Sequence, residues 1–292
     1  MTQLDGKRVL ITGGAQGIGL EMAIKFASRG AEIVIADLNE AKLAQAKVRI
    51  EETGAATWAF PVDVTNPASI ASLRAQVAAE AGPIDVLVNN AGVVFGGLFT
   101  ETPLDRHFRT YEVNVLGLVA MTHAFLPDLI ARPEAHLVNI ASATGFVGMP
   151  YGSTYASSKW AVIGFSESIR AELNVLGHKH VRSTIVCPSY IGTGMFDGVK
   201  APKATNMLDP DYLAEKVVQA VERNRINVLE PWMIKITPLL RDLLPMALYD
   251  KVSHLFGADT MMSDWRGHGG NEESTEEPQA QPGSSDQPEA DL

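Results

Sequence analysis

Short apolar segments alternate with longer helix-like segments through the first 230 residues, and this alternation limits the fold more than any other feature. The segments that we interpret as strands occupy residues 8–12, 32–37, 57–62, 84–89, 136–142, 181–187 and 226–229. Several are apolar on both faces, which is typical of a parallel sheet that helices cover on both sides. The alternation predicts an α/β fold with a doubly wound parallel sheet of about seven strands and helices on both faces.

Polar residues and glycines stand directly after these strands. The positions just past a strand end are Gly13, Asp37, Asp63, Asn90, Ser142 and Pro188. Ligands of a doubly wound sheet bind outside the carboxyl ends of the strands, near the point where the strand order reverses. We therefore expect these residues to meet at one edge of the sheet and to line a ligand site.

A glycine-rich turn, residues 12–19, joins the first strand to the first helix. Gly13, Gly17 and Gly19 would let the backbone approach a pyrophosphate, and the helix that follows offers free N–H groups and a partial positive charge. The spacing differs from the commoner G-x-G-x-x-G pattern, so a plain glycine turn is the alternative.

Asp37 ends the second strand, where a carboxylate can accept hydrogen bonds from adenosine ribose hydroxyls and would repel a 2′-phosphate. The nearest following cation is Lys42, one helical turn later. The sequence thus favours NAD over NADP. The alternative is that Asp37 only caps the next helix.

Tyr155 and Lys159 are four residues apart in a predicted helix, 153–173, and so share one helix face. A free phenol has a pKa of about 10, and an adjacent ammonium should lower that pKa toward neutrality. The pair can then act as a general acid/base. Tyr212 and Lys216 have the same spacing, so spacing alone does not choose between the two pairs.

Taken together, these motifs resemble the short-chain dehydrogenase/reductase family over about residues 5–230. The resemblance implies a Rossmann-type fold and an NAD-dependent oxidoreductase. It also selects Tyr155 and Lys159 over Tyr212 and Lys216, because Ser142 precedes Tyr155 just past a strand. An epimerase and a non-catalytic NAD-binding regulator are the alternatives, since one fold hosts many functions.

The resemblance also implies a role for each matched residue. Tyr155 would exchange a proton with the substrate oxygen, Ser142 would hold that oxygen, and Lys159 would lower the tyrosine pKa and bind ribose hydroxyls. Asn114 would hold a water that links Lys159 to solvent. The other cofactor contacts would come from Gly13, Gln16, Gly17, Ile18, Gly19, Asp37, Asp63, Val64, Asn90, Ala91, Gly92, Pro188, Ile191 and Thr193. One position departs from the family pattern, since Ser189 stands where a glycine is usual.

Two segments near the predicted catalytic residues carry apolar side chains: the loop 144–154, just before Tyr155, and the segment after Thr193. Beside Ser142, the candidate substrate contacts are Phe146, Met149, Tyr151, Met195 and Phe196. An apolar pocket with one polar centre suits a hydrophobic alcohol or its carbonyl. This end of the chain is similar to the retinol and hydroxysteroid dehydrogenase branch of the family. No metal ligand set is predicted.

Three regions follow from these motifs: a catalytic domain over 1–230, an apolar helical extension over 231–266 and an acidic tail over 267–292. Pro238 and Pro245 should break the extension into short helices that cap the cleft, pair with another subunit or lie on a membrane. The tail lacks Ile, Val, Phe, Tyr and Trp, so we expect it to be disordered.

Composition narrows the partners and the compartment. The net charge is −10 without a basic stripe, which argues against a nucleic-acid partner. A single cysteine, Cys187, suits a reducing compartment, and no charge-free apolar run is long enough to predict a transmembrane helix. Members of the similar branch often carry an N-terminal apolar segment that this sequence lacks. We expect a cytoplasmic homodimer or homotetramer with at most peripheral membrane contact.

Overall fold

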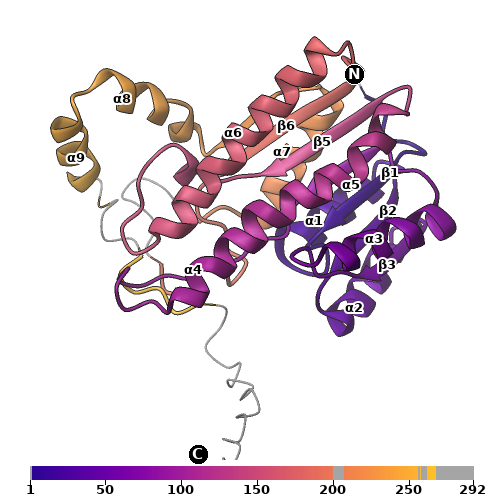
Figure 1. Cartoon of the computed structure of the whole chain (residues 1–292), viewed down its shortest axis with the longest axis horizontal. Coiled ribbons are helices and arrows are strands. Elements are labelled where there is room, and N and C mark those ends of the chain that lie inside the picture. Colours follow the sequence, from indigo (N-terminus) through magenta and orange to yellow (C-terminus); the bar gives the residue numbers. More distant parts are fainter. Residues whose placement is uncertain (1, 200–206, 256, 258–261, 268–292) are drawn as a thin grey trace, which may run out of the picture.

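Seven parallel strands form the central sheet of the computed structural model, which describes residues 2–199, 207–255, 257 and 262–267. The strands run in the order β3-β2-β1-β4-β5-β6-β7, so the direction of winding reverses between β1 and β4 (Figure 1). This confirms the predicted doubly wound, Rossmann-type sheet. The strand bounds are β1 (Arg8–Thr12), β2 (Glu32–Asp37), β3 (Thr57–Pro61), β4 (Val86–Asn89), β5 (Ala135–Ile140), β6 (Val181–Pro188) and β7 (Asn227–Glu230).

Helices cover both faces of the sheet and bury two separate apolar layers against it. The first layer contains α1 (Gly17–Ala27), α2 (Glu40–Glu51) and α7 (Pro210–Glu222). The second layer contains α3 (Pro67–Gln76), α5 (Leu118–Ile130) and the C-terminal half of α6 (Ser153–Val175). Because β1, β2, β4 and β5 contribute to both layers, their side chains are apolar on both faces, as the sequence pattern indicates.

Side-chain caps begin three of these helices, α2, α3 and α7. The Asn39 side chain accepts a hydrogen bond from the Lys42 N–H at 2.9 Å, and Asn66 does the same for Ala68 at the start of α3. Asp209 caps α7 through the N–H of Asp211 at 2.7 Å. Helix α1 begins after Gln16 without a side-chain cap, as α5 and α6 also do.

The sequence predicts no transmembrane helix, but the helical region 104–130 meets the length and composition of one. It consists of α4 (Leu104–Tyr111), a π-helix (Glu112–Gly117) and α5, and it is long and apolar enough to cross a membrane by length and composition. Met121, Phe125 and Leu129 of this region are buried against the sheet. This packing is that of a helix that covers a sheet.

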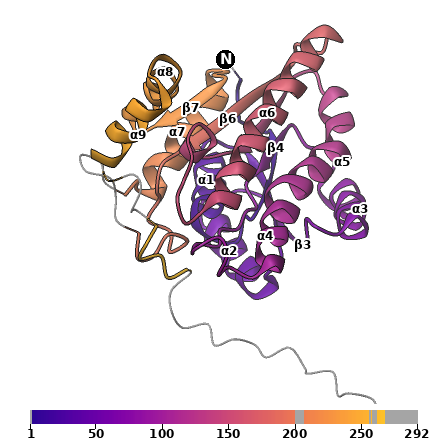
Figure 2. The same ribbon diagram turned by 60° about the vertical axis from the view of Figure 1, so that its left-hand side comes forward.

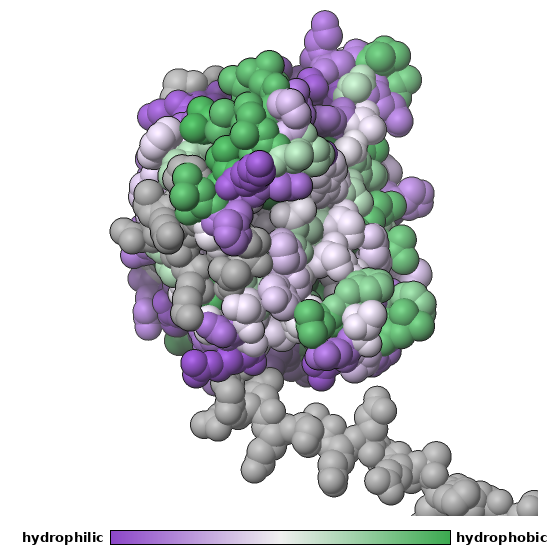
Figure 3. Space-filling view, turned by 90° about the vertical axis from the view of Figure 1, so that its left-hand side faces the viewer, coloured by the Kyte–Doolittle hydropathy of each residue, from purple (hydrophilic) through white to green (hydrophobic). Residues whose placement is uncertain are grey.

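After β7 the chain leaves the sheet through two short helices, α8 (Thr237–Leu243) and α9 (Met246–Leu255), which project to one side (Figures 1 and 2). Pro238 lies in the first turn of α8 and Pro245 separates the two helices, as predicted. Neither helix has a buried side chain. Figure 3 shows the resulting apolar surface, which includes Trp232, Ile236, Leu239, Leu240, Leu243, Met246, Leu248 and Leu255. The predicted disordered tail lies outside the described residues after Gly267.

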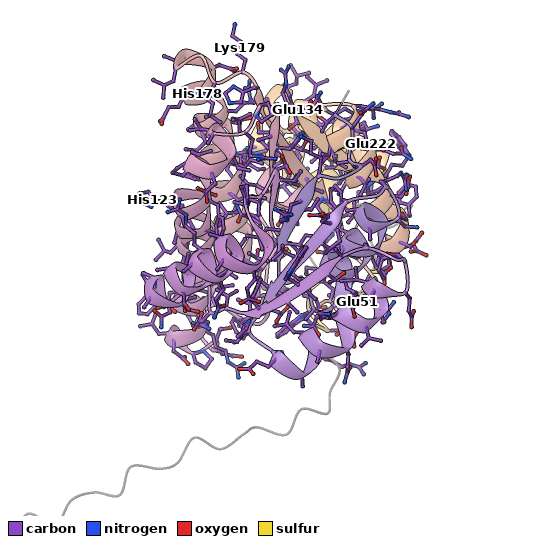
Figure 4. All side chains as sticks on the ribbon, turned by 90° about the vertical axis from the view of Figure 1, so that its right-hand side faces the viewer. Glu51, His123, Glu134, His178, Lys179 and Glu222 are labelled. Atoms are coloured by element: carbon purple, nitrogen blue, oxygen red, sulfur yellow. The ribbon has the colours of Figure 1, made fainter. Side chains whose placement is uncertain are left out.

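The N-terminal segment is bound to the rest of the domain near the amino ends of the strands. The Thr2 N–H donates to the Glu222 carbonyl at 2.8 Å, and its hydroxyl donates to the Glu134 carboxylate at 2.8 Å. Figure 4 shows Glu134 and Glu222 together at this edge. The edge at the carboxyl ends is left for the cavity described next.

Candidate active site

A cavity of about 600 Å³ lies at the carboxyl ends of the strands, where the strand order reverses. It is bordered by the turn after β1, by the ends of β2 to β6 and by the first turns of α6. The cavity brings together most of the predicted site residues, namely Gly13, Gln16, Gly17, Ile18, Asp37, Asp63, Val64, Asn90, Ala91, Gly92, Ser142, Tyr155, Lys159, Pro188, Ile191, Thr193, Met195 and Phe196. Ser189, the departure from the family pattern, also lines it.

The glycine turn presents an open helix end to this cavity. Gly13 and Gly17 adopt φ values of +63° and +55°, which favour glycine. The first turn of α1 carries no acidic side chain, and no side chain caps it. An uncapped helix N-terminus offers N–H donors and a partial positive charge, so this turn fits a pyrophosphate group.

Gly19 has a different part in the turn, because it does not line the cavity. A Cβ at this position would overlap the Gly13 carbonyl oxygen and lie 2.6 Å from the Asn90 side-chain nitrogen. Gly19 therefore allows α1 to pack closely against the turn. Asn90 supports the same turn, because its amide nitrogen donates to the carbonyls of Thr12 and Gly13 at 3.0 Å each.

Asp37 is fixed at the edge of the cavity by the backbone. Its carboxylate accepts hydrogen bonds from the N–H groups of Ala15 at 3.2 Å and Asn39 at 3.1 Å. The side chain that caps α2 is that of Asn39, so Asp37 is not the cap of this helix. Lys42 also lines the cavity, and its ammonium donates to the side-chain amide oxygen of Gln16 at 2.9 Å.

Arg109 reaches the cavity from α4, and the sequence analysis did not single it out. Its guanidinium donates to the Thr65 hydroxyl at 2.9 Å and lies 3.8 Å from the Asp63 carboxylate. Partial burial alone would raise the pKa of Asp63, but hydrogen bonds from Thr65 and the charge of Arg109 lower it. No motif marks Arg109, because α4 meets the end of β3 only in the folded chain.

Tyr155 and Lys159 lie on one face of α6 and are both buried, at 6% and 5% exposure. The ammonium lies 5.6 Å from the centre of the phenol ring and donates to the Ile140 carbonyl at 3.0 Å. Ser142, at the end of β5, forms a hydrogen bond with the phenol. The structure thus places a proton-carrying hydroxyl, a second hydroxyl and an amine together at one end of the cavity.

The direction of the tyrosine pKa shift differs from the expectation. Burial raises the pKa of Tyr155 to about 12, although the hydrogen bond to Ser142 lowers it in part. Burial also lowers the pKa of Lys159 to about 8. The expected lowering of the tyrosine pKa by the adjacent ammonium was wrong, because burial disfavours the charged form of each group.

Asn114 lies in the π-helix beside this group and does not line the cavity. Its side-chain oxygen accepts from the Val93 N–H at 2.8 Å, and its nitrogen donates to the Val93 carbonyl at 2.9 Å and the Ser158 hydroxyl at 3.1 Å. These bonds use the side chain to fix the segment after β4.

An apolar cluster continues the cavity beyond Tyr155, and we call it the Phe196 cluster. Its buried members are Val94, Met149, Tyr155, Ala156, Tyr190, Phe196 and Met262, with Tyr151, Met195, Val199 and Trp265 packed against them. The Phe196 ring meets Tyr155 and Tyr190 edge-on, with ring centres 5.9 Å and 5.2 Å apart. Sequence reasoning missed Val94, Tyr190, Met262 and Trp265, which come from distant segments.

Three predicted substrate residues do not line the cavity. Met149 and Tyr151 belong to the Phe196 cluster, and Phe146 lies outside both. It belongs to a different apolar cluster, with Ala141, Val162 and Ile163. The short 3₁₀ turn Ala143–Gly145 comes just before it in the chain. Phe146 therefore packs against α6 and does not line the cavity.

The second tyrosine and lysine pair, Tyr212 and Lys216, has similar internal geometry but a different environment. The ammonium lies 5.1 Å from the ring centre, and the Tyr212 hydroxyl donates to Glu230 at 3.3 Å. Tyr212 is 42% exposed on α7, and neither residue lines the cavity. The two pairs thus share their spacing and differ in burial and in position relative to the cavity, and these two features favour Tyr155 and Lys159 as the catalytic candidates.

The fold and the cavity are those of a Rossmann-type dinucleotide-binding protein. More particularly, residues 7–204 match the family model for short chain dehydrogenases, and the chain belongs to this family. It is 35% identical to short-chain dehydrogenase/reductase family 16C member 6 of Bos taurus, over 90% of this chain and 84% of that protein. Epidermal retinol dehydrogenase 2 of Mus musculus is 33% identical over 90% of this chain and 86% of its own length. 17-beta-hydroxysteroid dehydrogenase 13 of Rattus norvegicus is 30% identical over 86% and 83%, so the predicted branch is confirmed.

Solved structures agree with this assignment. A short chain dehydrogenase/reductase from Burkholderia phymatum in complex with NAD has a TM-score of 0.77 at 26% identity, covering 88% of this chain and 98% of its own. An alcohol dehydrogenase from the archaeon Thermococcus sibiricus complexed with 5-hydroxy-NADP has a TM-score of 0.68 at 25% identity, covering 77% and 94%. The neighbours thus include complexes with both kinds of nicotinamide cofactor.

Proposed function

We propose that this chain is an NAD(H)-dependent oxidoreductase that interconverts a hydrophobic alcohol and its ketone or aldehyde. One observation carries the proposal: Tyr155, Lys159 and Ser142 are buried together where a dinucleotide-sized cavity meets the Phe196 cluster. Relatives named for retinol and for 17-beta-hydroxysteroids support a hydrophobic substrate.

The reacting residues would divide the work as follows. When bound, the nicotinamide cofactor supplies or accepts the hydride. In reduction, Tyr155 gives its phenol proton to the substrate oxygen, and its raised pKa keeps that proton in place at neutral pH. Ser142 donates a hydrogen bond to the same oxygen as negative charge develops on it. In oxidation, the phenol must first pass its own proton to Lys159 in its neutral form or to solvent, and the phenolate then takes the alcohol proton.

Lys159 would link this step to the cofactor. It lines the cavity next to Tyr155, so its ammonium can bind ribose hydroxyls and return the phenol proton. The Ile140 carbonyl holds it at this position. A Cβ on Gly92 would lie 3.2 Å from the Asn114 side-chain oxygen, so the glycine leaves room for Asn114 beside Lys159.

The choice of NAD over NADP rests on Asp37. Its carboxylate is held at the end of β2 by two backbone N–H groups, where it would accept ribose hydroxyls and repel a 2′-phosphate. The uncapped turn at Gly17 and Ile18 would hold the pyrophosphate, Asp63 and Val64 the adenine, and Ile191 and Thr193 the nicotinamide amide. Met149, Tyr151, Met195 and Phe196 would contact the substrate.

The decisive experiment compares Tyr155→Phe with Tyr212→Phe. The first change should remove turnover of a hydrophobic alcohol by about a thousandfold or more and leave the Kd for NADH within about threefold. The second removes a hydroxyl from a pair of the same spacing and should change neither. Full turnover in Tyr155→Phe would refute the mechanism, and NADH binding without any turnover by the wild type would favour a regulatory NAD-binding protein.

We also propose how the protein is placed and assembled. Leu104, Phe108 and Leu116 are exposed on the long helical region, which suits a homodimer or homotetramer through α4, α5 and α6. The exposed apolar surface of α8 and α9 suits peripheral contact of a cytoplasmic enzyme with a membrane. Light scattering and co-sedimentation with lipid vesicles test the two ideas separately.

A further inference from the structure

The segment Met262–Gly267 returns to the catalytic face, far from the helices that precede it in the sequence. Figure 1 shows this yellow segment beside the loop that leads into α4. The Trp265 indole N–H donates to the Met195 carbonyl at 3.1 Å, and the Arg266 N–H donates to the Asp197 carbonyl at 2.9 Å. These two bonds attach the segment to the chain on either side of Phe196.

Glycines accept the segment on both sides. A Cβ on Gly96 would lie 2.8 Å from the ring carbons of Trp265, so the indole rests directly on the backbone there. Gly198 has a φ of +85°, and a Cβ on it would overlap the Asp264 carbonyl oxygen. Both contacts require the absence of a side chain.

The indole therefore joins the segments that enclose the substrate side of the cavity. Gly97, next to Gly96, donates its N–H to the Tyr151 carbonyl at 2.9 Å. Met195 and Phe196 line the cavity itself, and Met262 is buried in the Phe196 cluster. Because Phe196 meets Tyr155 edge-on, the position of the 195–199 segment sets the width of the space beside the phenol.

We infer that Trp265 is a positioning residue that holds Met195–Val199 as one wall of the substrate cleft and thereby sets specificity for long apolar alcohols. This inference rests on the proposed function. The indole does not line the cavity, so it acts through Met195 and Phe196. Helices α8 and α9 do not line the cavity either, and within the described part of the extension only Met262 and Trp265 join the Phe196 cluster.

The test compares 1-octanol with ethanol as substrates of Trp265→Ala. The variant should raise the KM for 1-octanol by about tenfold or more, and leave kcat, the KM for ethanol and the Kd for NADH within about threefold. Trp265→Phe keeps a ring and loses the bond to Met195, so its effect should be intermediate. Trp232→Ala is the matched control, because that tryptophan is 65% exposed and should change nothing.

Two further measurements keep the inference falsifiable. Gly96→Ala displaces the indole and leaves Trp265 in place, so it should reproduce the selective rise in the KM for 1-octanol. Calorimetry can also measure the Kd for 1-octanol in protein saturated with NADH, where no reaction can occur because alcohol and cofactor are both reduced. This binding should weaken in Trp265→Ala but not in Trp232→Ala.

The outcomes separate the two proposals. Weakened binding of 1-octanol by Trp265→Ala in a protein without turnover would refute the proposed function and support the positioning role. An unchanged ratio of KM values for 1-octanol and ethanol, or a wild type that binds 1-octanol no better than ethanol, would overturn the positioning role.

Discussion

Replacing Lys159 by Met should stabilise the cofactor-free protein while it removes activity. The ammonium is buried, and its pKa falls from 10.5 to about 8. At pH 7 the unfolded chain holds this proton far more tightly than the folded chain does. A shift of this size corresponds to about 3 kcal/mol of folding free energy lost at pH 7. Met keeps the apolar stem without the charge.

The pH dependence gives this prediction its sign. Because the folded pKa is lowered, the cost is fully present below about pH 8 and disappears as the pH rises toward 10.5. At pH 7, Lys159→Met should gain about 3 kcal/mol of unfolding free energy from the lost charge and lose about 1 kcal/mol with the hydrogen bond to Ile140. This difference in unfolding free energy from the wild type should fall by about 3 kcal/mol between pH 7 and pH 10.5.

Urea unfolding of both proteins at pH 7, 9 and 10.5 measures this difference, and titrations that the two proteins share cancel. Steady-state turnover of an alcohol with NAD should be lost in the same variant. Lys216→Met, in the pair on α7 that does not line the cavity, is the control. A variant less stable than the wild type at pH 7, or a difference independent of pH, would refute the argument that activity costs stability here.

Two other changes give equally direct predictions. Asp37→Ser should raise the KM for NAD and lower that for NADP, moving the ratio by about tenfold or more, because it removes the charge and leaves Lys42 nearby; steady-state kinetics with both cofactors measures this, and an unmoved ratio would remove Asp37 from cofactor selection. His136 is fully buried, its pKa is lowered to about 3, its Nε2 bonds Thr184 at 2.8 Å and its Nδ1 has no partner. The unfolded chain takes up this proton below pH 6.5, so wild-type stability should fall by about 2 kcal/mol between pH 7.5 and 5 through this group. His136→Phe should lack that loss in urea titrations, and parallel curves for the two proteins would contradict it.

Much of the fold and of the cavity was predictable because both depend on local patterns. Apolar segments with period-two or continuous character fix strands, and residues past parallel strand ends must share an edge. Gly13, Asp37 and Ser142 are therefore found at the cavity. The helix over 153–173 likewise brought Tyr155 and Lys159 to one face, since its geometry follows from helical spacing alone.

What the sequence missed depends on contacts between distant segments. Arg109 reaches Asp63 only because α4 passes the end of β3. Phe146, just after a 3₁₀ turn, packs against α6. The pKa of Tyr155 moved opposite to the expectation, since burial depends on the residues packed around the site and not on the lysine four positions away.

By itself, the sequence determined the parallel sheet and the edge at which the strand-end residues meet, because periodicity and strand-end position are properties of short segments. It offered two tyrosine and lysine pairs of equal spacing, and the family resemblance chose between them. Only the tertiary structure decided how those candidates are tuned and enclosed. Burial that raises one pKa and lowers another, and an indole that rests on Gly96 from the far end of the chain, arise when segments separated by more than a hundred residues pack together. Such packing has no counterpart in local spacing.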